Sequence, residues 1–419
     1  MKKSNKINAV AAILFAVILL GGTALFLMMK SRTVPKKVSV KIYYYDPISM
    51  ELIPETVQAE LPENTVLKVK KIIELLKTPG QSGVFPVLSK ETALNSVNVE
   101  NGICTLDFNK EISTIKPYSV RKEAIRVYGI VNTLTELPDI YAIRITIDGQ
   151  NVKYLSRYIE IDKPLAHLNS ALPDGKDVFV YYASPDLSEL VVQKRNVLSV
   201  QNPVELGKEI LKELLNGPFG TTIPRGTKIN DFYIKSGGTG VVDFSKEILE
   251  HSIGSQGEQT RILAVVNSLT ELPDIKSVKI LVDGKEINTL YGSVDTSQPI
   301  PRFMGIASDP ETAIPYFYIK INGETFLTPK IEAVEGKNRI TELFELLKSP
   351  PENKGTYISK NSKIESFEFS GKDNSLILKI SAPGIKDEDL PELIEQIKLS
   401  YLEFPAVSHI TLFINGVKY

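Results

Sequence analysis

Two stretches of this chain are almost the same: VNTLTELPDI at residues 131–140 and VNSLTELPDI at residues 266–275. They are identical at nine of ten positions and lie 135 residues apart. Each is followed by an alternating strand and an Asp-Gly turn, at Asp148-Gly149 and Asp283-Gly284. A more divergent copy, with FPAV at 404–407 and a turn at Asn415-Gly416, ends the chain. A period of about 135 residues is the size of a small domain, so we expect three tandem domains.

The same order of signals recurs in each copy. Strand-like runs rich in Val, Ile, Tyr and Phe come first, and an amphipathic helix follows. The helix starts are marked by three asparagines, a preferred N-cap residue, and the helix ends by a Leu-Leu-x-x-Pro sequence. These asparagines are Asn64, Asn202 and Asn338. A hairpin, a second helix and a last strand complete the copy, which gives the order ββ-α-ββ-α-β.

This order predicts an α+β fold in which helices cover a mostly antiparallel sheet. We expect the three domains to superpose, each with a sheet of its own. The expected segments are an N-terminal signal anchor and stalk at 1–37, domains at 38–156, 176–292 and 312–419, and linkers at 157–175 and 293–311. The linkers are placed where Pro, Ser, Asp and Gly are more frequent.

Residues 9–29 contain no charged side chain. As a helix they would span about 32 Å, the thickness of a bilayer core. The run lacks the small-residue cleavage site of a secretory signal, so we expect an uncleaved, single-pass transmembrane helix. Lysine and arginine flank it almost equally on both sides, so charge alone leaves the orientation open.

Charge and cysteine content exclude several functions. Residues 1–37 hold seven basic and no acidic residues, which leaves 42 basic against 50 acidic residues in the remainder. An acidic remainder argues against nucleic-acid binding. Cys104 is the only cysteine, so no intramolecular disulfide forms. Its alternating apolar neighbours predict a buried position in a strand.

We identify no catalytic, cofactor-binding or metal-binding residues. The histidines His167, His251 and His409 fall at positions that we interpret as unrelated, with His167 in a linker. Asp107 and Asp243 recur at a strand end, where they are either ligand or metal carboxylates or acceptors for turn N–H groups. Ser-x-x-Lys patterns at Ser113 and Ser119 have no counterpart in the other copies, so we expect no enzyme.

Copy two carries a run of motifs in one order: LLNGPFG at 214–220, IPRGT at 223–227, VVDFSKE at 241–247, NSLTELPD at 267–274 and VDGK at 282–285. Together they resemble the GerMN domain of sporulation and spore-germination proteins. Copy one matches in its second half and copy three in outline. The resemblance implies an extracytoplasmic protein held at the cell membrane of a spore-forming bacterium. It also implies a likeness to the ring-building modules of the channel between mother cell and forespore.

These observations predict a non-enzymatic scaffold of the sporulation or germination machinery, anchored through residues 9–29. Its partners would be the membrane, envelope or sporulation proteins, and further copies of itself. The alternative is an extracytoplasmic module that binds a ligand such as peptidoglycan or a germination signal. We expect Phe219 and Arg225 to be exposed interaction residues.

Overall fold

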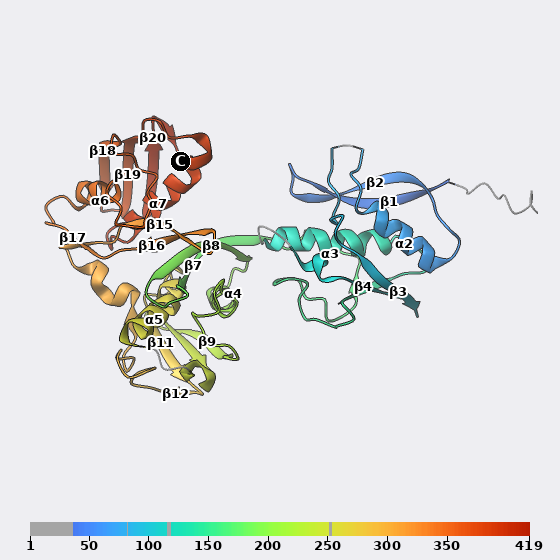
Figure 1. The fold of residues 1–419 in the computed structure, drawn as a ribbon, viewed down its shortest axis with the longest axis horizontal. Coiled ribbons are helices and arrows are strands. Elements are labelled where there is room, and N and C mark those ends of the chain that lie inside the picture. The colour runs from blue at the N-terminus through green and yellow to red at the C-terminus, as the bar shows by residue number, and fades with distance from the viewer. Residues whose placement is uncertain (1–36, 82, 115–118, 251–253) are drawn as a thin grey trace, which may run out of the picture. The chain divides into compact units, whose positions relative to one another are not determined.

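The computed structural model describes residues 37–419 except 82, 115–118 and 251–253 (Figure 1). The chain forms two compact units, the first ending at Pro173 and the second comprising Asp174–Tyr419. Among the residues so described, no helix is long and apolar enough to cross a membrane. The transmembrane helix expected at residues 9–29 lies outside the described residues.

The first unit holds the first copy of the repeat. Its elements are β1 Lys37–Asp46, β2 Glu51–Glu60, α2 Thr65–Leu75, β3 Leu94–Glu100, β4 Ile103–Phe108, the 3-10 helix η1 Lys110–Ser113, α3 Val120–Leu134, β5 Ala142–Ile147 and β6 Leu165–Ala166.

The second unit holds the other two copies. The second copy contains β7 Gly175–Ala183, β8 Leu190–Leu198, α4 Pro203–Leu215, β9 Ile229–Lys235, β10 Thr239–Phe244, η2 Lys246–Leu249, α5 Ser255–Leu269, β11 Ser277–Val282, β12 Lys285–Glu286 and β13 Ile300–Pro301. Two short elements, η3 Arg302–Ser308 and β14 Thr312–Ala313, lead to the third copy. That copy contains β15 Tyr316–Ile321, β16 Glu324–Pro329, β17 Glu332–Ala333, α6 Arg339–Leu347, β18 Lys363–Ser370, β19 Ser375–Ser381, η4 Asp387–Asp389, α7 Leu390–Leu402, β20 His409–Ile414 and β21 Val417–Lys418.

The predicted order ββ-α-ββ-α-β is confirmed in all three copies, and the chain is an α+β protein of tandem domains. The main sheets share the strand order β3-β4-β5, β9-β10-β11 and β18-β19-β20. Short strands pair with the last strand of each, namely β6 in the first sheet, β12 and β13 in the second, and β21 in the third. The central pair of each sheet is parallel, because a helix crosses over between its two strands. All other pairs in these sheets are antiparallel, so the prediction of a mostly antiparallel sheet is confirmed, and the parallel central pair is the feature that it did not include.

The local signals of the sequence are found where they were expected. The side chains of Asn64, Asn202 and Asn338 each accept a hydrogen bond from a backbone N–H in the first turn of the following helix. Both residues of the Asp148-Gly149 turn have positive φ, at 47° and 75°, as a two-residue hairpin turn requires. The turn at Asp283-Gly284 repeats these values closely, at 47° and 73°.

The first hairpin of each copy packs on the second helix of that copy. A hydroxyl on the helix accepts a hydrogen bond from a backbone N–H of the hairpin, and this contact recurs three times. The pairs are Tyr43 N–H to Thr133 Oγ1 at 2.9 Å, Tyr181 N–H to Ser268 Oγ at 2.8 Å, and Tyr316 N–H to Ser400 Oγ at 3.0 Å. The helix thus fixes the position of one tyrosine in each hairpin.

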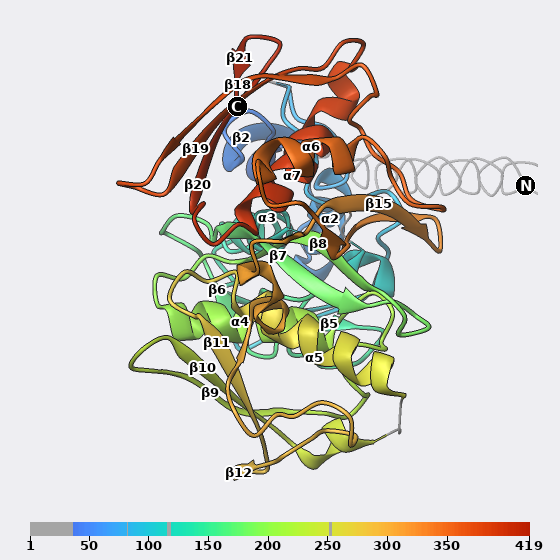
Figure 2. The ribbon, with the colours of Figure 1, turned by 90° about the vertical axis from the view of Figure 1, so that its left-hand side faces the viewer.

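The second and third copies are joined through their hairpins, contrary to the expectation that each copy keeps its own sheets. β7, β8, β16 and β15 form one four-stranded sheet, in which β8 pairs with β16. Figure 2 shows this sheet between two pairs of helices, α4 with α5 on one side and α6 with α7 on the other. The two main sheets lie on the outer sides of the helices (Figure 2).

The stretches that we expect to be linkers contribute to the folded units. Residues 157–175 include β6, which pairs with β5, and the buried side chains of Ile159 and Ile161. Residues 293–311 include β13, which pairs with β11. Each stretch therefore adds a strand to the copy that it follows.

Candidate functional site

The same tyrosine and glutamate meet on the hairpin side of every copy. The tyrosine belongs to the first strand, and the glutamate follows the second helix in the Thr-Glu-Leu-Pro segment or its third-copy equivalent. The three hydrogen bonds are Tyr43 Oη to Glu136 Oε1 at 3.0 Å, Tyr181 Oη to Glu271 Oε1 at 3.1 Å, and Tyr316 Oη to Glu403 Oε1 at 2.6 Å. We call the surface around each pair the tyrosine–glutamate face.

In the second unit, two of these faces are pressed together and join equivalent residues. Tyr181 Oη lies 2.8 Å from Tyr316 Oη. The strands that pair, β8 and β16 through Val192 and Leu327, are both the second strands of their hairpins, and they run antiparallel. A contact that uses the same patch on both sides is isologous and has the form of a two-fold dimer. The second and third copies therefore dock as a pseudo-two-fold pair.

One arginine serves both glutamates of this pair. Arg302 Nη2 donates to Glu271 Oε1 at 2.7 Å, to Glu403 Oε1 at 2.6 Å and to Tyr181 Oη at 2.6 Å. Arg302 Nε donates to the other oxygen of Glu403 at 2.9 Å, which makes that contact bidentate. Burial lowers the pKa of Arg302, but Glu403, Tyr181 and Glu271 outweigh this effect and raise the pKa, so the guanidinium stays charged.

Apolar contacts and a second ion pair extend the contact between the two copies. Phe219 and Phe326 have ring centroids 5.1 Å apart. Lys354 Nζ donates to both carboxylate oxygens of Glu189, at 2.7 and 2.8 Å. The core of the second copy also includes apolar side chains of the third, namely Ile314, Tyr316, Tyr318, Phe326, Leu327 and Leu399. The core of the second copy thus extends into the third, which also has a core of its own, and this shared part explains why the two copies form one compact unit.

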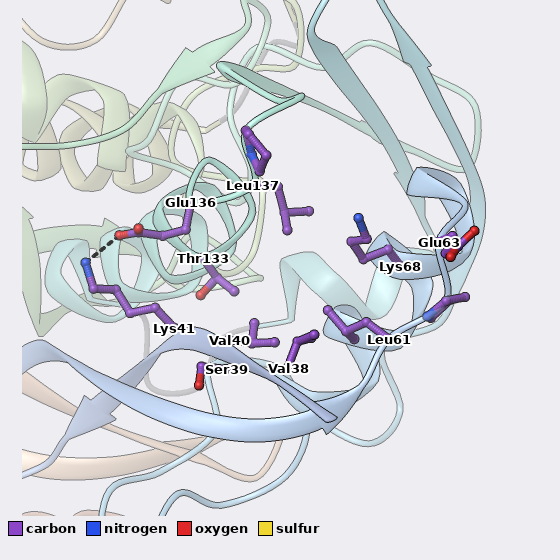
Figure 3. A pocket seen from close by; sticks show the side chains of 12 residues that line it. Val38, Ser39, Val40, Lys41, Leu61, Glu63, Lys68, Thr133, Glu136 and Leu137 are labelled. Carbon is purple, nitrogen blue, oxygen red and sulfur yellow. Dashed lines mark hydrogen bonds and ion pairs between the residues drawn. The ribbon is translucent and has the colours of Figure 1, made fainter. Parts of the chain in front are cut away.

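The first copy presents the same face without a second domain of its unit on it. The Glu136 side chain is 30% exposed, against 3% for Glu403. Lys41 Nζ donates to Glu136 at 2.8 Å (Figure 3). Lys41 is thus the cation that binds the glutamate here, as Arg302 does in the second unit. The hydrogen bond from Lys41 holds the pKa of Glu136 below its usual value, against the opposing effect of partial burial.

A pocket of about 420 Å³ lies beside this face in the first copy. It is lined by Val38, Ser39, Val40, Lys41, Leu61, Pro62, Glu63, Lys68, Thr133, Glu136, Leu137 and Pro138. Figure 3 shows Lys41 and Glu136 joined on one side of the pocket and Lys68 on another. The polar groups come from β1, the start of α2 and the Thr-Glu-Leu-Pro segment, so the repeated motif itself forms one wall.

The structure corrects our interpretation of His167, which we placed in a linker at a position unrelated to the repeats. His167 lies 135 residues before Arg302, the spacing of the repeat itself. The two residues also make equivalent contacts, since Thr135 Oγ1 lies 3.0 Å from His167 Nδ1 and Thr270 Oγ1 accepts from Arg302 at 3.3 Å. The His167 ring packs edge-on against Tyr43, with centroids 5.7 Å apart. The sequence KPLAHL at 163–168 matches QPIPRF at 298–303, and this match beyond the Asp-Gly turn is the signal that connects the two residues.

Comparison with known proteins identifies the family of the first two copies. A family model described as Germane, for sporulation and spore germination, matches residues 41–153 and 179–288. These ranges make up more than half of the chain and include the faces of the first two copies. The chain belongs to the Germane family.

A curated relative supports the same family. The chain is 25% identical over 247 residues to the spore germination protein GerM of Bacillus subtilis (strain 168). This alignment covers 53% of the chain and 64% of GerM, so less than two thirds of that protein is matched.

Solved structures include the tandem GerMN domains of the sporulation protein GerM from Bacillus subtilis. The likeness has 20% identity and a TM-score of 0.44, and covers 57% of this chain and 92% of that one. A putative lipoprotein from Clostridium perfringens gives 29% identity and a TM-score of 0.23, over 32% of this chain and 89% of that one.

The recurrent aspartates of the Germane repeat accept hydrogen bonds from turns. Asp107 Oδ1 accepts from the Gly149 N–H at 2.7 Å, and Asp243 Oδ1 accepts from the Gly284 N–H at 2.8 Å. This confirms the turn-acceptor interpretation of these residues. Across residues 37–419, outside the gaps named above, no cluster of His, Cys, Asp and Glu side chains could hold a metal ion.

The two proposed interaction residues of the second Germane copy line one hollow of about 540 Å³, formed by residues 215–220 and 223–227. Arg225 is exposed there, as expected. Phe219 is not, because it is half-buried and packs on Phe326 of the third copy. Phe219 thus contributes to the contact inside the second unit, and a role for Arg225 in binding a partner remains a prediction.

Cys104 and the Ser-x-x-Lys patterns have structural roles where they are described. Cys104 is fully buried in β4, and burial raises the pKa of its thiol to about 12. Ser113 Oγ donates to the Lys110 carbonyl at 2.7 Å, a hydrogen bond within η1. Lys116 lies outside the described residues.

Proposed function

We propose that this Germane protein is a non-enzymatic scaffold of the sporulation or germination machinery that works through protein–protein contacts. Residues 9–29 would anchor it in the cell membrane as a single helix, with the domains outside the cytoplasm. Arg225 and the exposed tyrosine–glutamate face of the first copy are the surfaces proposed for contact with envelope or sporulation proteins.

The observation that carries the proposal is the docking of the second copy on the third. The most polar groups of the repeat are engaged in that contact, since Arg302 bridges Glu271 and Glu403 at 2.7 and 2.6 Å. A domain that binds another domain of its own type through its repeated residues is suited to assembly. Family membership supports a role in sporulation or germination for such an assembly.

The alternative is an extracytoplasmic module that binds peptidoglycan fragments or a germination signal. The pocket of the first copy favours it, because Lys41, Lys68 and Glu136 line a hollow of about 420 Å³. Ligand pockets of small molecules begin at about 300 Å³ and carry a few polar groups. This reading places binding at one copy rather than at a repeated surface.

Affinity capture from membranes of the sporulating source organism tests the scaffold. The full-length chain and its Arg225→Ala, Arg302→Ala and Lys337→Ala variants would be captured under native conditions, and co-purified proteins quantified by mass spectrometry. Lys337, whose side chain is 83% exposed, serves as the control. We expect the control to retain the partners of the wild type and the Arg225 variant to lose most of them, because its surface is altered. The Arg302 variant should lose them because the docking inside the second unit is weakened.

Deletion of a single copy is a poor substitute for these point variants, because the second and third copies share a core. The scaffold is contradicted if no protein is enriched over the anchor segment alone. The ligand-binding alternative gains support if muropeptides bind the wild type, measured by calorimetry, and Lys68→Ala abolishes that binding.

A further inference from the structure

We propose that the tyrosine–glutamate face of the first copy docks against the same face of a second copy of this chain, which makes the protein a two-fold homodimer. This inference deepens the proposed scaffold function and rests on it. The model for the contact is the pair formed by the second and third copies. The described residues contain three such faces, of which two occupy each other inside the second unit, and the first unit holds the third.

The first copy keeps the residues that make the contact in the second unit. Tyr43 and Glu136 hold the positions of Tyr181 and Glu271, and Tyr43 is bound to its helix through Thr133 in the same way. The hydrogen bond between two tyrosine hydroxyls in the second unit joins identical residue types. Two first copies can repeat it without any new group.

An apolar residue of the edge strand β2 is exposed only in the first copy, at the position that lies on the pseudo-two-fold axis in the second unit. Its side chain is on the side of the hairpin opposite Tyr43. Val191 and Thr328 adjoin the paired residues of β8 and β16, and they are 0% and 1% exposed. The register of the hairpins places Ile53 at the same position, because Ile53 lies opposite Tyr44 as Val191 lies opposite Tyr182. Ile53 is 37% exposed. Covering it would remove apolar surface from water, as happens at its two counterparts.

Charge makes the first copy complementary to itself. In the second unit, one arginine serves two glutamates, and the residues two positions before the tyrosines are Phe179 and Ile314. In the first copy the equivalent residue is Lys41, which binds Glu136. Two first copies would therefore bring two lysines to two glutamates, and the contact would need no arginine from a third segment. Charged groups arranged in this way select the partner.

The edge of β2 determines how strong a contact we expect between two first copies. Val192, which pairs with β16, is replaced by Pro54 in the hairpin of the first copy. Proline has no N–H to donate to a neighbouring strand and weakens edge pairing. The contact would depend on side chains and be weaker than the one inside the second unit. Anchoring in a membrane would compensate by raising the effective concentration of the faces.

A cysteine at position 53, next to the expected two-fold axis, tests whether two first copies dock in this way. Residues next to a two-fold axis lie close to their own mates, so Ile53→Cys should form an intermolecular disulfide. The full-length chain in detergent would carry Ile53→Cys or Ile48→Cys, each with Cys104→Ser, and be oxidised with copper phenanthroline. Ile48 is 93% exposed at the tip of the same hairpin, which makes it a matched control. We expect Ile53→Cys to cross-link about tenfold faster, as specific contact raises local concentration.

Charge reversal separates docking from folding. Within the Ile53→Cys chain, Lys41→Glu should place four carboxylates at the contact and abolish cross-linking. Adding Glu136→Lys restores the balance and should restore the cross-link, which a merely unfolded variant would not do. Circular dichroism would confirm that each variant is folded.

The proposal is overturned if Ile53→Cys and Ile48→Cys cross-link at equal rates, or if Ile53→Cys is cross-linked in cells only to a different protein. In either case the capture of envelope proteins by the wild type could persist. Failure of the dimer is thus distinguishable from failure of the scaffold.

Discussion

The tyrosine–glutamate face of the first copy and the paired faces of the second and third copies contain the same side chains in different surroundings. In the pair, the carboxylate of Glu403 is 3% exposed and held by Arg302 and Tyr316. In the first copy, Glu136 is 30% exposed and held by Lys41 and Tyr43. The comparison shows that the identity and origin of the cation change a surface motif into a buried domain contact.

The largest difference should appear when the two equivalent residues Arg302 and His167 are removed. Arg302→Ala leaves Glu403 buried without its cation, and should lower the free energy of unfolding of the second unit by about 3 kcal/mol. His167→Ala, at the equivalent position of the first copy, should cost less than about 1 kcal/mol because the site is open to water. Urea denaturation followed by circular dichroism measures both. Equal losses for the two variants would contradict the comparison.

Removal of one hydroxyl should give a smaller contrast. Tyr316→Phe removes the buried hydroxyl that donates to Glu403 and lies against the Tyr181 hydroxyl, and should cost about 1–2 kcal/mol of stability. Tyr43→Phe removes the equivalent hydroxyl at an exposed site and should cost less than about 0.5 kcal/mol. Thermal unfolding of the two variants tests this order, and a reversed order would show that the first face is the more tightly packed.

Acid should weaken the first face gradually. The folded pKa of Glu136 lies below the ordinary value of a glutamate, chiefly because of the hydrogen bond from Lys41. A lowered carboxylate pKa contributes stability above the unfolded pKa and loses it as the pH falls through the folded value. We expect Glu136→Gln to remove a few tenths of a kcal/mol at pH 7 and nothing at pH 3, since the pair is partly exposed. Stability that is unchanged between these pH values in both chains would argue against the ion pair.

The single thiol should report on the first unit alone. Cys104 is buried, and burial raises the pKa of its thiol to about 12, so it is protonated and inaccessible in the folded state. We expect no labelling by Ellman's reagent at pH 8 until the first unit unfolds. The labelling rate in Arg302→Ala should equal that of the wild type. Faster labelling in that variant would show that the two units unfold together.

The sequence predicted the domain type and its local details because these depend on short-range chemistry. The caps at Asn64, Asn202 and Asn338, the Asp-Gly turns and the buried Cys104 all follow from the preferences of neighbouring residues. The strand run at 178–182 was visible in the same way. The parallel pairing at the centre of each main sheet could not be predicted in this way, because it arises from the path of the crossover helix and not from the strands themselves.

The site could be predicted only in part. Tyr181, Glu271 and Arg302 are far apart in sequence, and nothing in their local patterns indicates that they meet. The repeat spacing does connect His167 with Arg302, but an arginine and a histidine share no obvious signature. Phe219 was predicted to be exposed, which is wrong because it packs on Phe326 of the third copy, and no local pattern indicates that contact. Which surfaces are covered is a property of the tertiary arrangement.

The reach of Arg302 has a consequence for the order in which the chain folds. Its bidentate partner, Glu403, lies 101 residues further along the chain. Contacts of such separation form late, because a long loop must close before they contribute. A chain that emerges N-terminus first can complete its first copy early, whereas the second copy waits with Val191 and Tyr181 uncovered until the last helix arrives. We therefore expect the nascent second copy to be the stage at which a chaperone is needed and at which truncated products aggregate.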